Sequence, residues 1–522
     1  MKKQNRLFVS LLWIIVMGMG CGRSAGLPAP RASPAFTPQP SPSPSISPLR
    51  CARPFRPYGE KVPPVTLEAL AWVEKVIGAH RIRQLGPSPR PLLPWGRSPD
   101  GRWLIVVIPQ DEGNGSSEAA MIDRQGLARR WLNRTLMILS PYTSPSTFPL
   151  SAWTRWRGKP WTISWLADGE ALWIDEQGRI WRSQGEQARL LPTPAPALWV
   201  EAGAEGKALA LIESPEGTSE LWRIHLPQER WERVSPPEAG GEIVGWEPKR
   251  TWALTMQIRA RSPQETPMPA PPGATWAEAT FWQVPLQEQA PARRLSHVTL
   301  LTVGTDAWMP PSQALRDGRL WVLGWPTPEG VGALVDVRGG RWLRWEDLGG
   351  SPTDRLITVQ ASPQGAWVAW LIGSAGGDGG QTILEIRQGD GLEKGWRRDG
   401  LGLVGWHPED HAVVLGMGGW GPPDTLRPLM VLPLPPEGEP RLLAHAAWPV
   451  SFTRDRIVTR DSLHPARVYA FDLEGNLRDE LDLSSQAELV RTIWGTGEAV
   501  YLDVGWTEGT DCRYSLIEWI PR

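Results

Sequence analysis

The feature that most constrains the fold is a short turn unit that recurs along most of the chain. Its clearest copy is Ser98-Pro-Asp-Gly-Arg-Trp103, followed at once by the β-branched run Leu104-Ile-Val-Val-Ile108. Pro fixes φ, Asp hydrogen-bonds its own backbone and Gly accepts the positive φ of a tight reversal. The unit therefore predicts a β-hairpin between the apolar segment before the turn and the run after it.

Related units share one plan of four strands joined by a turn, a loop and a second turn. They begin near residues 92, 161, 198, 243, 312, 357, 403, 450 and 490. From residue 357 onward the spacing is about 45 residues, which is the length of a four-stranded propeller blade. Propellers typically have four to eight blades. We therefore expect eight blades, in a range of seven to nine, with the short unit after Trp161 as the weakest copy.

Two copies carry a resemblance to a known group. Ser98-Pro99-Asp100-Gly101 and Ser362-Pro363-Gln364-Gly365, each followed by a strand with Trp, resemble the repeats of TolB-type and related WD-repeat-like bacterial propellers. The resemblance covers residues 92–522 at the level of repeats. It implies an all-β fold, a single β-propeller of four-stranded antiparallel blades. It implies little about activity, because this architecture hosts many functions.

The two ends of the folded part predict how the ring closes. The last unit supplies three strands, and the segment 80–85 has the pattern of a fourth strand, so an N-terminal strand is expected to complete the last sheet. The propeller then spans residues 80–522. Residues 65–79 are expected to form a short amphipathic helix, whose apolar face consists of Leu67, Leu70, Val73 and Ile77.

The N-terminus has the pattern of an export signal. Residues 1–20 carry three basic side chains and then an apolar run that is too short to cross a bilayer. The run ends at Gly20-Cys21, which resembles the lipobox of bacterial lipoproteins. The resemblance implies a lipidated Cys21 and an exported protein held at the outer face of the cytoplasmic membrane. A secreted protein with an unmodified Cys21 is the alternative.

Residues 21–64 are expected to be a tether. Between residues 28 and 48 Pro alternates with Ser, Ala and Thr, a composition that favours extended polyproline II. The other two cysteines, Cys51 and Cys512, lie at opposite ends of the folded part, and in an oxidising compartment we expect a disulfide between them. Two unrelated free thiols are the alternative.

Composition limits the partners. The net charge is −1 and the pI is about 6.7, which gives no electrostatic footprint for nucleic acid. The chain has 32 Trp against 5 Tyr and 7 Phe, so indole rings must fill most of the flat interfaces between sheets. The expected partners are the membrane, through the lipid anchor, and an envelope protein or glycan.

The motifs that could carry chemistry are weak. Residues 416–421 fit G-x-G-x-x-G, but two prolines follow where a phosphate-binding helix should begin, which favours a loop. His407 and His411 are four residues apart, but Pro408 between them favours a solvated turn over a metal site. No G-x-S-x-G elbow is present. We therefore assign no catalytic residue, metal or cofactor.

The most informative pattern is the length of the loops between second and third strands. The long ones run through residues 109–117, 262–279, 372–380, 416–425 and 505–511. In propellers these loops share one face, opposite the Pro-Asp-Gly turns, and loops on a rigid scaffold favour binding. The candidate binding residues on this face are Trp276, Trp325, Trp420 and Trp506. Packing of these indoles between blades is the alternative.

These observations favour a non-catalytic binding or scaffold module over an enzyme. Exposed indoles on one face suit stacking on sugar rings or gripping peptide side chains. The alternative function is a glycan-processing enzyme, a hydrolase or lyase, with carboxylates in the central bowl. The residues do not indicate which ligand, which process or which oligomeric state.

Overall fold

The computed structural model divides the chain into two compact units, Met1–Ser47 and Pro48–Arg522. All residues that the structure describes belong to the second unit. They are residues 51, 63–109, 116–126, 129–137, 163–166, 169–175, 177–184, 187–213, 219–247, 249–260, 274–303, 334–336, 341–343, 355–373, 382–388, 395–417 and 428–522. The expected signal peptide, Cys21 and most of the tether lie outside these residues.

Antiparallel sheets of consecutive strands make up the first half of the described chain. The first sheet contains β3 (Leu93–Arg97), β4 (Trp103–Pro109), β5 (Ser116–Asp123) and β6 (Arg129–Met137), and the second contains β7 (Ile163–Trp165), β8 (Ala171–Ile174), β9 (Ile180–Gln184) and β10 (Gln187–Leu190). The third sheet contains β11 (Ala197–Ala202), β12 (Lys207–Glu213), β13 (Ser219–His225) and β14 (Arg230–Arg233). The fourth contains β15 (Glu242–Trp246), β16 (Trp252–Ala260), β17 (Ala274–Pro285) and β18 (Arg293–Val303). A short 3-10 helix, η3 (Pro237–Ala239), joins the third sheet to the fourth.

The second half continues the plan. The strands β19 (Leu334–Asp336) and β20 (Arg341–Leu343) form a two-stranded sheet, and the next sheet contains β21 (Arg355–Ala361), β22 (Trp367–Gly373), β23 (Thr382–Gln388) and β24 (Trp396–Asp399). It is followed by the sheet of β25 (Leu401–Trp406), β26 (Ala412–Met417), β27 (Leu429–Pro433) and β28 (Arg441–Leu442), and by the sheet of β29 (Ala446–Phe452), β30 (Ile457–Asp461), β31 (Arg467–Phe471) and β32 (Leu477–Asp482). The last sheet contains β33 (Leu489–Thr496), β34 (Ala499–Glu508) and β35 (Asp511–Trp519), together with two strands from the N-terminal side of the chain.

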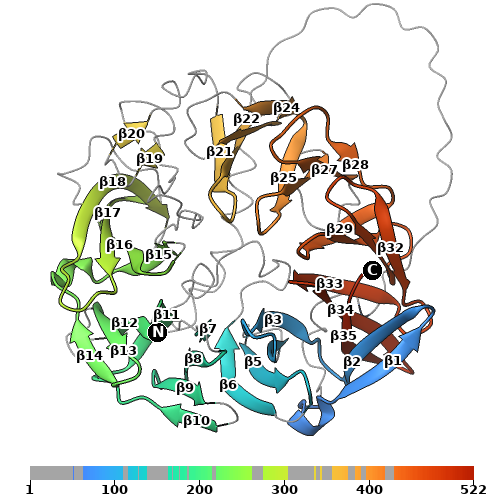
Figure 1. Cartoon of the computed structure of the whole chain (residues 1–522), viewed down its shortest axis with the longest axis horizontal. Helices are drawn as coiled ribbons and strands as arrows, with labels where there is room; N and C mark the ends of the chain where they lie inside the picture. Colours follow the sequence, from blue (N-terminus) through green and yellow to red (C-terminus); the bar gives the residue numbers. More distant parts are fainter. Residues whose placement is uncertain are drawn as a thin grey trace, which may run out of the picture. The chain divides into compact units, whose positions relative to one another are not determined.

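The sheets follow one another around a ring, with first strands toward the middle and fourth strands outside (Figure 1). This is a β-propeller, so the predicted fold class is confirmed. Eight of the described sheets have four or five strands, and β19 and β20 form a ninth, which is the described part of the unit that begins near residue 312; both numbers lie in the expected range of seven to nine blades. The unit after Trp161, which we expected to be the weakest, forms a complete sheet of β7 to β10.

The ring closes through the N-terminal side of the chain. The strand β2 (His80–Ser88) pairs antiparallel with β35, and Ile82, Arg83 and Gln84 lie opposite Trp519, Glu518 and Ile517. The predicted completion of the last sheet is therefore present. A further strand, β1 (Trp72–Ile77), pairs with the outer side of β2 and makes this sheet five-stranded.

The helix expected over residues 65–79 is wrong. The segment contains a single-turn 3-10 helix, η2 (Leu67–Ala69), and then strand β1, joined to β2 by a two-residue turn at Gly78, whose φ is +56°. A helix of this length is marginal by itself, whereas pairing satisfies the backbone groups along the free edge of β2. The apolar spacing does reflect burial in part, because Leu70 is fully buried while Val73 is exposed.

The turns between first and second strands share one geometry. In the first sheet Ser98 N–H bonds the carbonyl of Trp103 at 2.9 Å, and Gly101 N–H bonds the carbonyl of Ser98 at 2.8 Å. The corresponding bonds recur at Ser362 and His407. The fourth turn residue has positive φ each time, +72° at Gly101, +69° at Gly365 and +59° at Asp410, so the predicted turn chemistry is confirmed and Asp410 is the exception in residue type.

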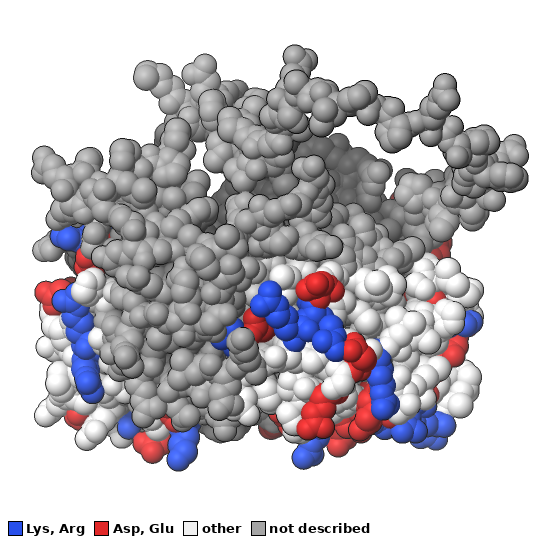
Figure 2. Space-filling view, turned by 90° about the horizontal axis from the view of Figure 1, so that it is seen from above, with Lys and Arg blue, Asp and Glu red and all other residues white. Residues whose placement is uncertain are grey.

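Apolar clusters lie between neighbouring sheets, and salt bridges join their outer parts. Arg189 on β10 pairs with Glu229 beyond β13, and Arg398 on β24 pairs with Glu439 beyond β27. Figure 2 shows basic and acidic side chains side by side on the described part of one side of the molecule. Among the described residues no helix is long and apolar enough to cross a membrane.

Candidate functional site

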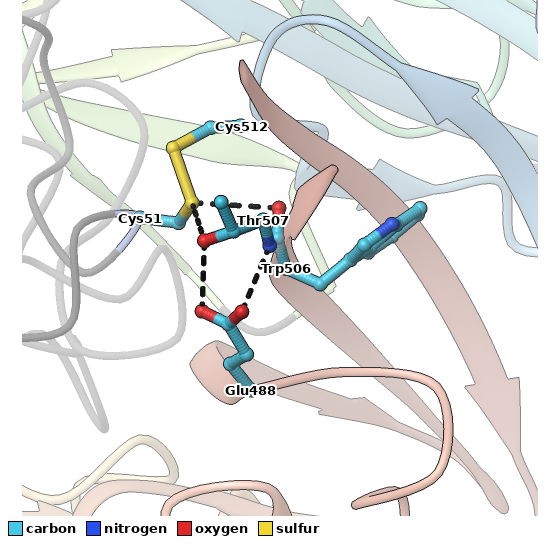
Figure 3. Close-up of a disulfide and its surroundings, with 5 residues drawn as sticks. All are labelled: Cys51, Glu488, Trp506, Thr507 and Cys512. Atoms are coloured by element: carbon cyan, nitrogen blue, oxygen red, sulfur yellow. Dashed lines mark hydrogen bonds between the residues drawn. A yellow bond between two sulfur atoms is a disulfide. The ribbon is translucent and has the colours of Figure 1, made fainter. Parts of the chain in front are cut away.

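The structure joins Cys51 to Cys512 at the end of the hairpin formed by β34 and β35 (Figure 3). Their Cα atoms are 5.6 Å apart, and both side chains are buried. Cys512 is the second residue of β35 and lies opposite Thr507 of β34. The disulfide expected from the cysteine count is thus present, and it fixes residue 51 to the last strand of the chain.

The surroundings of the bridge are polar. The Cys51 sulfur lies 3.4 Å from the carbonyl oxygen of Trp506 and 3.5 Å from the hydroxyl oxygen of Thr507. The Thr507 backbone N–H and hydroxyl each donate a 3.1 Å hydrogen bond to the carboxylate of Glu488 (Figure 3). Glu488, which directly precedes β33, therefore fixes the end of β34 through Thr507.

Residues 505–511 are not the long loop that we expected. The pairing of β34 with β35 continues through Trp506 and Arg513 to Glu508 and Asp511, so only a two-residue turn remains, with Gly509 at φ +63°. Trp506 is on a strand, half-buried, and packs against the apolar cluster between the last two sheets. It therefore presents only part of its ring to solvent.

The other candidate residues divide into two groups. Trp276 is on the 12-residue strand β17, not on a loop, because β17 begins at Ala274 and pairs with both β16 and β18. Trp325 and Trp420 lie outside the described residues. Of the four indoles, the structure places the side chain of Trp506 alone, so the candidate face stays a prediction.

Sequence reasoning missed two exposed apolar side chains on this face. Met417 ends β26 and is 50% exposed, and Leu463 follows β30 and is 69% exposed. Strands β26, β30 and β34 are the second strands of three consecutive sheets, so their ends share the face on which Trp506 lies. The signal in the sequence was an apolar residue at or just past the end of a β-branched run, where the turn should be polar.

The loop after β30 is held by one buried carboxylate. Asp461 accepts hydrogen bonds from Leu463 N–H and the Tyr469 hydroxyl, both at 2.7 Å, and lies 3.1 Å from Nδ1 of His464. Burial by itself raises the pKa of Asp461, but these hydrogen bonds hold it below its ordinary value. The exposed Leu463 thus has a fixed backbone.

His407 and His411 are not equivalent. The His407 ring is buried; its Nε2 lies 3.1 Å and 3.0 Å from the carbonyl oxygens of Thr453 and Arg454, and its Nδ1 accepts a 3.2 Å bond from Glu409 N–H. Both ring nitrogens are engaged, and burial lowers the pKa of His407. The solvated turn that we expected describes His411, which is exposed, but is wrong for His407, which links two sheets.

An incompletely paired ion pair lies where the last sheet meets the first. Asp503 on β34 is fully buried; one carboxylate oxygen accepts a 3.4 Å bond from Leu92 N–H, and the other is 3.5 Å from Nη1 of Arg491. The Arg491 guanidinium stacks on the ring of Tyr514 at 4.9 Å. Burial raises the pKa of Asp503 to about 6, against the opposing effect of Arg491.

No family model and no curated protein matches the chain. Solved structures similar to it include an oligogalacturonate lyase from Vibrio parahaemolyticus, at 10% identity over 87% of this chain and 98% of that one, with a TM-score of 0.38. A second is Sqt1 of Chaetomium thermophilum bound to the N-terminus of ribosomal protein L10, at 12% identity over 83% of this chain and 98% of that one, with a TM-score of 0.36. A third is the β-propeller domain of the Trilobed protease from Pyrococcus furiosus, at 14% identity over 68% of this chain and 97% of that one, with a TM-score of 0.32. These similarities concern the fold alone and carry no information about activity.

Proposed function

We propose that this protein is an exported propeller, anchored by lipid at Cys21, that acts as a non-catalytic binding or scaffold module for an envelope protein or glycan. The disulfide between Cys51 and Cys512 supports this location, because such bonds persist in oxidising compartments. The propeller supplies a rigid ring of sheets, and its loop face is the proposed contact surface.

The observation that carries the binding role is the exposure of Met417 and Leu463 on the face where Trp506 also lies, at the ends of second strands of three consecutive sheets. Apolar side chains gathered on one face of a propeller suit a partner surface. On the opposite face, Ser362, Asp410 and His407 hydrogen-bond across neighbouring sheets, so their polar atoms serve the fold.

The binding role is tested by cross-linking the full chain in native envelope and measuring recovery of bound partner. Replacing Met417 and Leu463 by Ala should lower recovery at least about tenfold, since exposed contacts at an interface centre carry most of the affinity. The matched control replaces Leu442 and Leu477, exposed on the outer strands β28 and β32, by Ala, and should recover the partner as the parent does. Unchanged recovery with the first variant would refute the proposed face.

A glycan partner is tested separately with purified envelope polysaccharide. Retention of the full chain on the polysaccharide, without change in its chain length, supports a binding module. Release of shorter products would refute the non-catalytic role and favour the glycan-processing alternative.

The anchor is tested by Cys21→Ser. The variant should move from the membrane fraction to the soluble fraction, because a lipidated Cys is the attachment that we propose. Continued membrane attachment of Cys21→Ser would contradict lipidation and leave the binding proposal standing.

A further inference from the structure

The disulfide and the ring-closing strand meet the last strand at the same place. Cys512 carries the bridge to Cys51, and Tyr514, two residues on, lies opposite Ser88 at the end of β2. The segment from Cys51 to Ser88, about 40 residues, therefore leaves the start of β35 through a covalent bond and returns to it through strand pairing.

We propose that the Cys51–Cys512 bridge is a clasp that keeps the closing strands β1 and β2 in the last sheet and prevents them from peeling off as a unit. The inference concerns ring closure and does not rest on the proposed binding function.

The closing strands form the outer edge of their sheet and are open to peeling from it. In the described sheet β1 pairs with β2 alone, over six residues, and it is the outer edge. The other side of β2 pairs with β35. Two side-chain hydrogen bonds add to this pairing, from Arg83 to the Glu518 carboxylate at 2.9 Å and from Gln84 to the Ser515 hydroxyl at 2.8 Å. Edge strands with few partners open at lower cost than central strands.

The bridge changes what peeling produces. Without it, the peeled segment is a free N-terminal arm. With it, the segment is a loop closed at Cys512, and closing a loop of this length removes much of the entropy that the peeled arm would gain. On that model the open state should be on the order of 10²–10³-fold less populated with the bridge than without it.

The bridge also determines which strand carries a pull on the N-terminal arm. Force applied before Cys51 enters β35 directly, and β35 is paired on both sides, with β2 and β34. Without the bridge, the same force would act first on η2 and the edge strand β1. A pull would then open the sheet strand by strand, because edge pairs break one after another.

Hydrogen exchange of the full chain tests the clasp. Backbone amides of β1 and β2 should exchange on the order of 10²–10³-fold faster in the double variant Cys51→Ser, Cys512→Ser than in the parent. Amides of β25–β28, in a sheet without the bridge, are the internal control and should change little. Equal acceleration in all sheets, or no acceleration in β1 and β2, would overturn the clasp.

A second measurement covers the case in which the double variant does not fold. The folded parent is treated with dithiothreitol, a dithiol that closes to a cyclic disulfide as it passes two electrons and two protons to the sulfurs of Cys51 and Cys512. The thiols are then alkylated and exchange is measured. Selective acceleration in β1 and β2 supports the clasp, and exchange identical to that of the oxidised chain refutes it.

Discussion

The hydroxyl of Ser362 donates a 2.5 Å hydrogen bond to a carboxylate oxygen of Asp410, which belongs to the next sheet of the ring. In the first sheet the equivalent hydroxyl, of Ser98, bonds Asp100 within its own turn. Position 364 holds Gln where that turn has Asp. The turn at Ser362 has no carboxylate of its own, and Asp410 of the next sheet supplies the acceptor instead. The hydrogen bond that is local to the turn at Ser98 therefore joins two sheets at Ser362.

Replacing Asp410 should destabilise the ring more than its position on a turn suggests. Its carboxylate also accepts bonds from Gln364 N–H at 3.1 Å and Ala366 N–H at 3.0 Å. Asp410→Ala leaves these donors and the Ser362 hydroxyl without an acceptor, at a cost of roughly 2–4 kcal/mol. Urea unfolding of the parent and the variant measures the loss.

Asp410→Gly is the matched control for the backbone. Asp410 has φ +59°, where Gly is favoured over any other residue. If the carboxylate matters, Gly should lose nearly as much stability as Ala despite the relieved backbone. A Gly variant as stable as the parent would show that the links to Ser362 and its turn contribute nothing.

Asp503 should make stability fall as pH rises between about 4 and 6. Its pKa is raised from 3.8 to about 6, so in this window the folded protein keeps a proton that the unfolded chain has lost. The free energy of unfolding then decreases by roughly 3 kcal/mol across the window, and above it this group no longer makes the free energy depend on pH.

Asp503→Asn isolates that effect, because Asn resembles the protonated acid at every pH. Other carboxylates, such as Asp472 and Asp482, whose pKa values are lowered to about 2, titrate in both proteins and cancel in the comparison. The stability of the parent relative to Asp503→Asn should fall from pH 4 to pH 6 in urea titrations. A difference independent of pH would refute the raised pKa.

Local turn chemistry and strand periodicity predicted most of the fold. The turn at Ser98 and the pattern of residues 80–85 act through neighbours in sequence or through one missing strand, so the chain itself reveals them. The prediction of a helix over residues 65–79 is wrong because the apolar spacing of the segment fits a helix. Its structure is decided by the free edge of β2, which exists only after the ring has formed.

The candidate face was predicted less well for a similar reason. The sequence predicts a long loop over residues 505–511, but β34 and β35 keep pairing through the polar residues Thr507 and Glu508. Conversely, Leu463 is exposed on a loop whose backbone Asp461 holds, and the only signal in the sequence is its place just past the end of a β-branched run. The link between Ser362 and Asp410 joins residues of different repeats, which a repeat-by-repeat comparison cannot find.

Glu518→Gln should weaken the seam where the ring closes. The Glu518 carboxylate is buried and accepts bonds from Arg83 at 2.9 Å, from Arg124 and from the Tyr501 hydroxyl at 3.4 Å. Burial lowers the pKa of both arginines, but they stay charged, and removing their shared counter-ion should cost roughly 3 kcal/mol.

Glu439→Gln is the control, because Glu439 pairs with Arg398 at an exposed position on the outer rim. Such pairs contribute little, so this variant should unfold at the same urea concentration as the parent. Equal effects of the two substitutions would mean that burial at the seam does not strengthen the Glu518 network.

Gly495→Ala should be the costliest glycine substitution at a sheet boundary. A Cβ built on Gly495 would lie 2.1 Å from the carbonyl oxygen of Phe452 in the preceding sheet, and Gly495 N–H donates a 2.8 Å bond to Ser451. The main chains of β33 and β29 must separate to accept it, at about 3 kcal/mol or more. Gly509→Ala meets no atom within 4 Å but has φ +63°, so it should cost only about 1 kcal/mol. A lower urea midpoint for Gly509→Ala than for Gly495→Ala would contradict this. It would show that backbone conformation at the hairpin, and not contact between sheets, sets the cost of replacing these glycines.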